Sequence, residues 1–193
     1  MTRPLSPGAT IGIVGGGQLG RMLAIAAARL GYRTAVLEPE PDCPAGQVAN
    51  IHIAAPYEDS RGLEQLAAAS DVVTYEFENI PGATARSLAD RVPVHPLPEA
   101  LETAQDRLSE KIFFNSLGIA TAPFVSVEND DDLAQGLARF GGNGVLKTRR
   151  MGYDGKGQRV FHKATAKMVR GTVAAMGGGL ILEGLVHFER EIS

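Results

Sequence analysis

Residues 146–158 combine three glycines with four basic side chains, directly after an apolar run that ends at Leu146. Glycine lacks the Cβ atom that would keep a backbone away from a phosphate, and it readily adopts positive φ. Successive N–H groups in such a turn form an anion-binding concavity, and Lys147 and Lys156 add charge suited to polyphosphate. The segment therefore indicates either a polyphosphate-binding loop or an ordinary basic hairpin turn, and its spacing alone does not decide between them.

A second glycine-rich turn, residues 15–20, follows a short apolar run and precedes a predicted helix at residues 21–30. A strand, the spacing G-x-G-x-x-G and a helix together are the context of the dinucleotide-binding fingerprint. Glu38 ends the next predicted strand, where a nicotinamide or flavin enzyme places a carboxylate on the ribose hydroxyls. The pattern raises an NAD(P)- or flavin-dependent oxidoreductase as one hypothesis, although similar turns open many sheets that bind no dinucleotide.

The composition narrows the function classes. The 193 residues are 44% hydrophobic and 21% charged, with a net charge of −3 and a single cysteine, Cys43. These values are typical of a globular protein with a substantial core, and they give no electrostatic argument for nucleic acid or a membrane surface. One cysteine excludes an intrachain disulfide and agrees with a reducing compartment, and no apolar run reaches the length of a membrane span. We therefore expect a cytoplasmic protein that binds neither nucleic acid nor membrane.

Strands and helices alternate through the first half of the chain, which predicts a parallel, doubly wound sheet over residues 1–97. Ligands of such sheets bind beyond the carboxyl ends of the strands, where Gln18, Glu38 and Glu76 fall. Glu76 and Glu78 would point to the same side of a strand. These two carboxylates could hold sugar hydroxyls or a metal, or could mark a solvated strand end.

After a proline-rich linker, residues 99–117 are interpreted as one amphipathic helix. Its buried side is expected to carry four apolar residues, Leu101, Ala104, Leu108 and Ile112. Arg107 and Lys111 lie one turn apart on this predicted helix. In the simplest interpretation they are surface cations paired with Glu110 or Asp106.

The remaining residues, 122–186, predict a small α+β unit. Its expected elements are strands at residues 124–127, 144–147, 158–161 and 180–183 and helices at residues 130–140 and 165–176. The glycine loop then joins two antiparallel strands, unlike a Walker-type loop, which joins a strand to a helix. Such a loop would close over a nucleotide like a flap.

Six motifs occur in the order found in one enzyme family. They are GGGQLGRM (15–22), YEFEN (75–79), QDR (105–107) with Lys111, LKTRR (146–150), GYDGKGQ (152–158) and FEREIS (188–193). With them the chain resembles the 5-(carboxyamino)imidazole ribonucleotide synthases, which are ATP-grasp ligases of purine biosynthesis. The resemblance covers essentially the whole chain.

The resemblance implies an α/β fold in several parts. A Rossmann-like, pre-ATP-grasp domain at residues 1–97 would bind the ribotide, and a linker and connecting helix would occupy residues 98–121. The small ATP-grasp lid domain would span residues 122–186. Residues 187–193 would begin a third ATP-grasp domain that is absent from this chain. The family resemblance also implies a homodimer.

The implied reaction uses ATP to phosphorylate bicarbonate, and the resulting carboxyphosphate carboxylates 5-aminoimidazole ribonucleotide. The family's ATP contacts fall on Arg107, Lys147, Gly152, Tyr153, Asp154, Gly155, Lys156, Gly157, Gln158, Glu183, Gly184, Leu185, Val186 and Glu191. The implied catalytic residues are Tyr153, Asp154 and Lys156. Glu76 is expected to hold the ribotide hydroxyls, with Gln18 and Leu19 lining the same pocket.

The family also requires Mg²⁺, whose ligands the resemblance implies to lie in the missing carboxyl-terminal part, so no metal ligand is expected in this chain. By itself the chain is therefore expected to be inactive. A non-catalytic nucleotide-binding module remains a further alternative.

Overall fold

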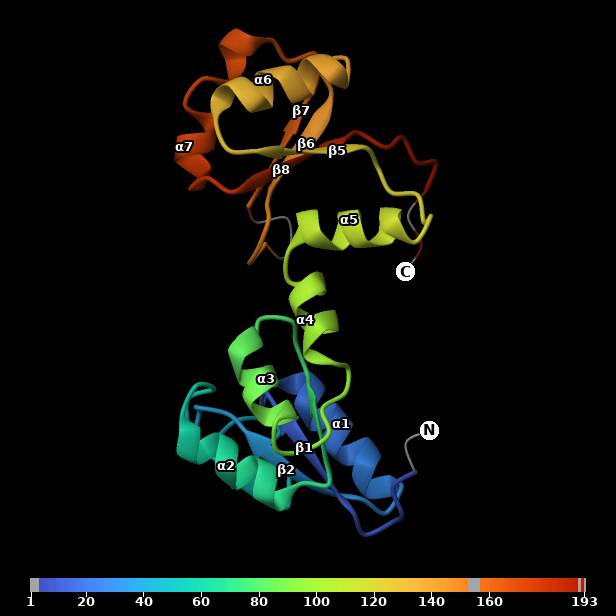
Figure 1. The fold of residues 1–193 in the computed structure, drawn as a ribbon, viewed down its shortest axis with the longest axis vertical. Coiled ribbons are helices and arrows are strands. Elements are labelled where there is room, and N and C mark those ends of the chain that lie inside the picture. Colours follow the sequence, from blue (N-terminus) through green and yellow to red (C-terminus); the bar gives the residue numbers. More distant parts are fainter. Residues whose placement is uncertain (1–3, 153–156, 191, 193) are drawn as a thin grey trace. The chain divides into compact units, whose positions relative to one another are not determined.

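The computed structural model describes residues 4–152, 157–190 and 192. The chain divides into two compact units, Met1–Glu102 and Thr103–Ser193 (Figure 1). Each unit has its own sheet and its own buried core.

The first unit is built on a four-stranded parallel sheet in the order β3-β2-β1-β4. Its strands are β1 (Thr10–Val14), β2 (Arg33–Leu37), β3 (Ile51–Ile53) and β4 (Val72–Tyr75). Its helices are α1 (Gln18–Arg29), α2 (Ser60–Ala69) and α3 (Gly82–Ala89). The predicted parallel sheet is thereby confirmed.

The two faces of this sheet are covered by different helices. Ile13 and Val36 pack in one cluster with Ala24 of α1. The next residue along each strand, Val14 or Leu37, points to the opposite cluster, which contains buried residues of α2 and α3. This alternation is the period of two that a strand imposes, and it makes the sheet doubly wound.

The second unit carries an antiparallel sheet in the order β5-β8-β6-β7. Its strands are β5 (Phe124–Val127), β6 (Gly144–Thr148), β7 (Gln158–Phe161) and β8 (Leu180–Gly184). Helix α6 (Asp130–Arg139) packs on this sheet through Leu133 and Leu137, which are buried with Leu146 and Leu182. The four strands expected in this unit are present, and the antiparallel hairpin that carries the glycine loop is confirmed.

The single helix expected over residues 99–117 is wrong. The structure has two helices, α4 (Pro98–Ala104) and α5 (Arg107–Ser116). Asp106 separates them because its backbone is extended and its carboxylate accepts hydrogen bonds from the N–H groups of Leu108 and Ser109. An aspartate in that role begins a helix rather than continuing one.

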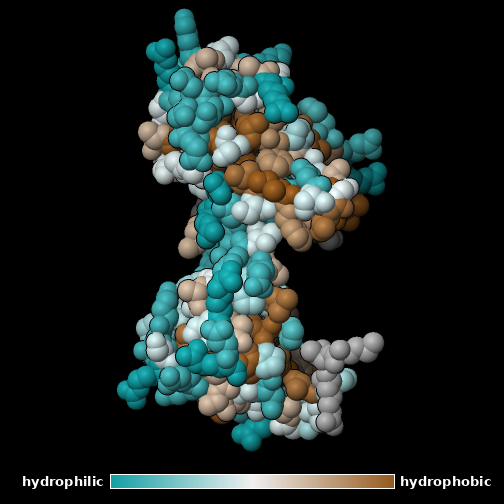
Figure 2. Space-filling view, in the orientation of Figure 1, coloured by the Kyte–Doolittle hydropathy of each residue, from teal (hydrophilic) through white to brown (hydrophobic). Residues whose placement is uncertain are grey.

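The predicted buried side of this segment is only partly correct. Leu101 is buried and Leu108 is half-buried, whereas Ala104 is exposed and Ile112 is 55% exposed. With Phe113, Ile112 gives α5 an exposed apolar surface. Figure 2 shows such apolar surface, in brown, on each unit.

The helix expected over residues 165–176 is also interrupted. A 3-10 turn, η1 (Ala166–Val169), is followed by the short helix α7 (Thr172–Met176). Gly171 lies between them at φ 73°, and the N–H groups of Gly171 and Val173 donate to the carboxylate of Asp130. The left-handed backbone at the glycine stops the helix, and the aspartate satisfies the N–H groups at its restart.

None of the helices in the described part of the chain has both the length and the apolar character that a membrane crossing requires.

Candidate functional site

The glycine turn of the first unit is closed by an internal carboxylate. Gly15, at φ 104°, lets the chain leave β1 and turn into α1. Glu76 follows β4 immediately, and its Oε1 accepts a hydrogen bond of 2.7 Å from the N–H of Gly17. Its Oε2 accepts a second one from the N–H of Gly20. A carboxylate at this position also complements the positive end of the α1 dipole.

A second carboxylate holds the same turn from the neighbouring strand. Oε2 of Glu38 accepts hydrogen bonds from the N–H of Gly16, at 2.8 Å, and from the hydroxyl of Tyr57, at 2.6 Å. Burial raises the pKa of Tyr57, and its hydrogen bond to Glu38 raises it further, so the hydroxyl stays protonated and remains a donor. Glu38, expected from the spacing to face a ribose, thus serves the turn itself.

These contacts decide what the turn can bind. In a dinucleotide-binding fold the pyrophosphate accepts hydrogen bonds from the N–H groups at the start of the first helix. Here the N–H groups of Gly16, Gly17 and Gly20 already donate to two glutamates. A pyrophosphate would have to displace these anions, so the geometry argues against a dinucleotide.

Hydroxyl groups are a better match for Glu76. A carboxylate offers about four acceptor positions, so two backbone bonds orient it without exhausting it. Gln18 and Leu19 are exposed on the first turn of α1, next to the glycines that bind Glu76. The three residues expected to bind the ribotide are therefore brought together.

The second unit holds a cluster of two lysines around one glutamate. Lys147 of β6 places its Nζ 2.9 Å from Oε2 of Glu183, on the adjacent strand β8. Lys111 of α5 places its Nζ 3.6 Å from the same oxygen and 6.0 Å from the ring centroid of Phe124. Glu183 is only 8% exposed. One carboxylate between two ammonium groups leaves a net positive charge, which suits a polyphosphate.

Arg107 binds the base of the glycine loop. Its guanidinium donates to the carbonyl oxygen of Thr148, at 2.8 Å, and to that of Gly152. The N–H of Thr148 donates in turn to the carbonyl of Gly157, at 2.8 Å. Arg107 was expected to contact phosphates directly. In this structure its guanidinium instead binds the backbone carbonyls of Thr148 and Gly152, at the start of the loop.

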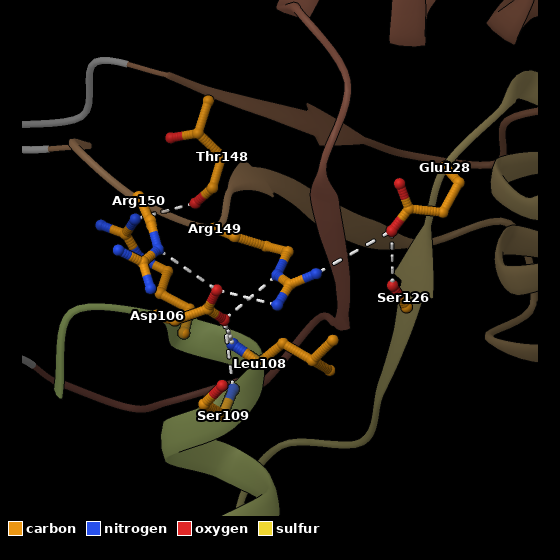
Figure 3. Close-up of polar contacts among 9 residues, drawn as sticks. Asp106, Leu108, Ser109, Ser126, Glu128, Thr148, Arg149 and Arg150 are labelled. Carbon is orange, nitrogen blue, oxygen red and sulfur yellow. Dashed lines mark hydrogen bonds and ion pairs between the residues drawn. The ribbon is translucent and has the colours of Figure 1, made fainter. Parts of the chain in front are cut away.

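Asp106, the residue before Arg107, forms an ion pair that the sequence interpretation did not include among the site residues (Figure 3). Its carboxylate accepts from Nε of Arg149, at 3.1 Å, and from an Nη of the same guanidinium, at 2.8 Å. Nε of Arg150 lies 3.5 Å from it. The pair lines a pocket of about 420 Å³, whose lining residues are Asp106, Thr148, Arg149, Arg150, Gly178 and Gly179.

The pKa of Asp106 reflects these contacts. Burial by itself would raise it, but the hydrogen bonds from Arg149 and from the N–H groups of Ser109 and Leu108 outweigh burial and hold the pKa below its ordinary value. The carboxylate is therefore ionised throughout the physiological range.

An acid titration of stability tests this pairing. A carboxyl with a depressed folded-state pKa contributes stability that is fully present above the unfolded-state value, about 3.9, and is lost as the pH falls through the folded value. We expect Asp106→Asn to lower the unfolding free energy by on the order of 2 kcal/mol at neutral pH. The difference from the wild type should shrink below about pH 4, as measured by urea unfolding at a series of pH values. A difference that grew on acidification would contradict the ion pair.

The remaining expected site residues either lie outside the described residues or are placed only by the strand they begin, end or follow. Tyr153, Asp154, Gly155, Lys156 and Glu191 lie outside the described residues. Gly184 ends β8, where its N–H donates to the carbonyl of Pro123, and Leu185 and Val186 follow it. Gln158 begins β7. In the described part of the chain, no three His, Cys, Asp or Glu side chains gather in a way that could hold a metal ion.

Comparison with known proteins agrees with both units. Residues 8–105 match the family model of the ribonucleotide synthetase preATP-grasp domain, and residues 112–193 match that of the ATP-grasp domain. The chain is 54% identical over 190 residues to the N5-carboxyaminoimidazole ribonucleotide synthase of Brucella melitensis, covering 98% of this chain and 52% of that protein.

Solved structures give the same result. An ADP complex of an N5-carboxyaminoimidazole ribonucleotide synthetase superposes with a TM-score of 0.90 at 42% identity, covering 98% of this chain and 50% of that one. The Aspergillus clavatus N5-carboxyaminoimidazole synthase, in complex with ADP and 5-aminoimidazole ribonucleotide, gives a TM-score of 0.83 at 26% identity, covering 95% and 48%.

The chain spans about half the length of these relatives. The match to the first family model includes the glycine turn and both glutamates that close it. The second match begins at residue 112 and includes Lys147 and Glu183. The chain therefore belongs to the ribonucleotide synthetase preATP-grasp family, and it continues into an ATP-grasp domain.

Proposed function

We propose that this chain supplies the ribotide-binding part and part of the nucleotide-binding site of an ATP-dependent carbon–nitrogen ligase. In the proposed reaction ATP phosphorylates bicarbonate, and the carboxyl group of carboxyphosphate passes to the exocyclic amine of 5-aminoimidazole ribonucleotide. The products are 5-(carboxyamino)imidazole ribonucleotide, ADP and phosphate, as a step of purine biosynthesis. The observation that carries this proposal is the Lys111–Glu183–Lys147 cluster beside a glycine loop, in a chain whose relatives are named for this activity.

The nucleotide is assigned to the second unit. Lys147 and Arg107 are proposed to neutralise phosphate oxygens, because cations stabilise the charge that phosphoryl transfer spreads over them. Arginine has five N–H donors, so Arg107 retains donors for a phosphate while it binds the two carbonyls of the loop base. The N–H groups of residues 152–158 are proposed to cover the transferring phosphoryl group.

The adenine is assigned to the end of β8. Both lysines approach Oε2 of Glu183, so we assign the contact with the adenine amine to Oε1. The backbone of Gly184, Leu185 and Val186 would then read the ring edge, and Glu191 would hold the ribose.

The ribotide is assigned to the first unit, where Glu76 would accept hydrogen bonds from its hydroxyls beside Gln18 and Leu19. Tyr153, Asp154 and Lys156 are proposed to face the aminoimidazole and bicarbonate. Mg²⁺, when bound, would supply positive charge that stabilises the phosphates during the transfer. The described residues contain no group of three His, Cys, Asp or Glu side chains suited to that ion, and we propose no ligand for it among them. We further propose a cytoplasmic homodimer.

A comparison of ligands tests the proposal against the oxidoreductase alternative. Titration calorimetry with ADP and Mg²⁺ should give saturable binding, because the cluster around Lys147 carries net positive charge. NADH at the same concentrations should show no change in fluorescence, because Glu38 and Glu76 occupy the N–H groups that a pyrophosphate needs. Saturable binding of NADH, together with no detectable binding of ADP, would reject the ligase assignment.

A further inference from the structure

Thr148, at the end of β6, connects the two ends of the glycine loop. Its carbonyl oxygen and its N–H are each linked by hydrogen bonds to a different end of the loop. Its carbonyl accepts from Arg107, which also donates to the carbonyl of Gly152, at the start of the loop. Its N–H donates to the carbonyl of Gly157, near the end of the loop. Arg107 therefore fixes the start of the loop relative to Thr148, while the N–H of Thr148 itself holds the end of the loop.

The position of Arg107 is itself fixed by its neighbour. Arg107 is the first residue of α5, and its N–H donates to the carbonyl of Arg149, at 3.0 Å. Asp106 binds the guanidinium of the same Arg149 through both carboxylate oxygens (Figure 3). The two consecutive residues at the start of α5 are thus held to one residue just after β6, once through the backbone and twice through side chains.

The ion pair is well suited to hold a fixed geometry. Asp106 is 5% exposed, and its carboxylate also caps α5 through the N–H groups of Leu108 and Ser109. A carboxylate this buried needs all its acceptor positions matched, and an arginine bound at both oxygens restricts orientation as well as distance. Glu128, the other carboxylate near Arg149, is 3.9 Å away with an exposed side chain, so it constrains the guanidinium far less.

One helix therefore presents two cations to the candidate nucleotide site. Arg107 and Lys111 lie one turn apart on α5, the first at the loop base and the second 3.6 Å from Glu183. A rotation or shift of α5 would move both groups at once. The Asp106–Arg149 pair is a side-chain contact that opposes such a shift at the start of the helix, together with the backbone bond from Arg107 to Arg149.

We propose that Asp106 and Arg149 are positioning residues for nucleotide binding: their ion pair sets the place of Arg107, and with it the position of Gly152 at the start of the loop. This inference rests on the proposed function, in which the glycine loop meets the phosphates of ATP. Neither residue needs to touch the nucleotide. Asp106 acts through Arg107, and Arg149 acts through Asp106.

The test uses the full-length gene product and two substitutions that spare the helix cap. Asp106→Asn keeps a side-chain oxygen that caps α5 about as well as aspartate does but removes the negative charge. Arg149→Lys keeps the positive charge but loses the two-point contact. Each is expected to weaken ADP binding by about tenfold or more, while the KM for the ribotide changes by less than about twofold. The double variant should lose no more ADP affinity than whichever single variant loses more, because the two residues act as one pair.

Glu128→Gln is the matched control, because it removes the exposed carboxylate on the other side of Arg149; its ADP affinity should equal that of the wild type. Wild-type ADP affinity in both single variants, with only the unfolding temperature lowered, would show a purely structural ion pair and overturn the inference. Failure of the wild type itself to bind ADP would instead refute the proposed function.

Discussion

Replacing Lys147 with methionine is expected to weaken ADP binding by about ten- to a hundredfold, since a hydrogen bond to a charged group contributes roughly 1.5–3 kcal/mol. The substitution also leaves Glu183 with Lys111 as its remaining cationic neighbour in the cluster, at 3.6 Å. Removing one partner from a buried ion pair costs roughly 3–5 kcal/mol, and the second lysine should hold the loss of unfolding free energy at the lower end. Calorimetric titration and urea unfolding of the same preparation measure the two effects.

Lys167→Met is the control for Lys147→Met, because Lys167 is an exposed lysine of the same unit, in η1. It should change neither quantity. If Lys147→Met kept the wild-type ADP affinity although the protein was folded, the phosphates would have to be assigned away from β6.

Glu76→Ala should lower stability and substrate affinity in the first unit by comparable amounts, and here the affected substrate should be the ribotide. Two N–H groups, those of Gly17 and Gly20, would lose a charged acceptor at once. We expect the unfolding free energy to fall by about 2–4 kcal/mol. The kcat/KM for the ribotide should fall by about ten- to a hundredfold, because the proposed hydroxyl acceptor is gone and the turn that carries Gln18 is no longer held. The KM for ATP should hardly change.

Steady-state kinetics of the full-length gene product, with each substrate varied in turn, measures this selectivity. Glu58→Ala, which removes an exposed carboxylate from the same unit, is expected to behave as the wild type. An unchanged ribotide KM with a raised ATP KM would move Glu76 to the nucleotide side.

Most of the fold follows from local pattern. The β1–turn–α1 segment could be predicted because an apolar run, a glycine turn and a helical period stand in sequence. The break at Asp106 could not, because the residues on both sides form helix readily and an aspartate either caps a helix or lies exposed within one. Only the partner at Arg149, 43 residues away, shows which role it takes.

The sequence predicts which site residues lie at the ends of strands, but it does not predict which of them pair with one another. Glu76 and Lys147 stand at or near the ends of strands, where ligands of sheet proteins are expected, and the sequence places them there. The bond between Lys147 and Glu183 joins residues 36 positions apart, and it depends on β6 and β8 being neighbours. Glu38 shows the converse: its spacing suggested a ribose contact, yet its carboxylate is bound by Gly16 and Tyr57.

The glycines of the first turn differ in what requires them, and this bears on how the turn evolves. Gly15 is fixed by its positive φ, and a methyl group at Gly20 would lie 2.8 Å from the carbonyl oxygen of Gly15. At Gly17 a methyl group would instead lie 2.9 Å from Oε1 of Glu76, and its other near neighbours are also atoms of that side chain. Gly17 is thus required to be glycine only because the side chain of Glu76 lies beside it. A lineage that lost the glutamate would release Gly17 to drift, while Gly15 and Gly20 stayed constrained by the path of the chain.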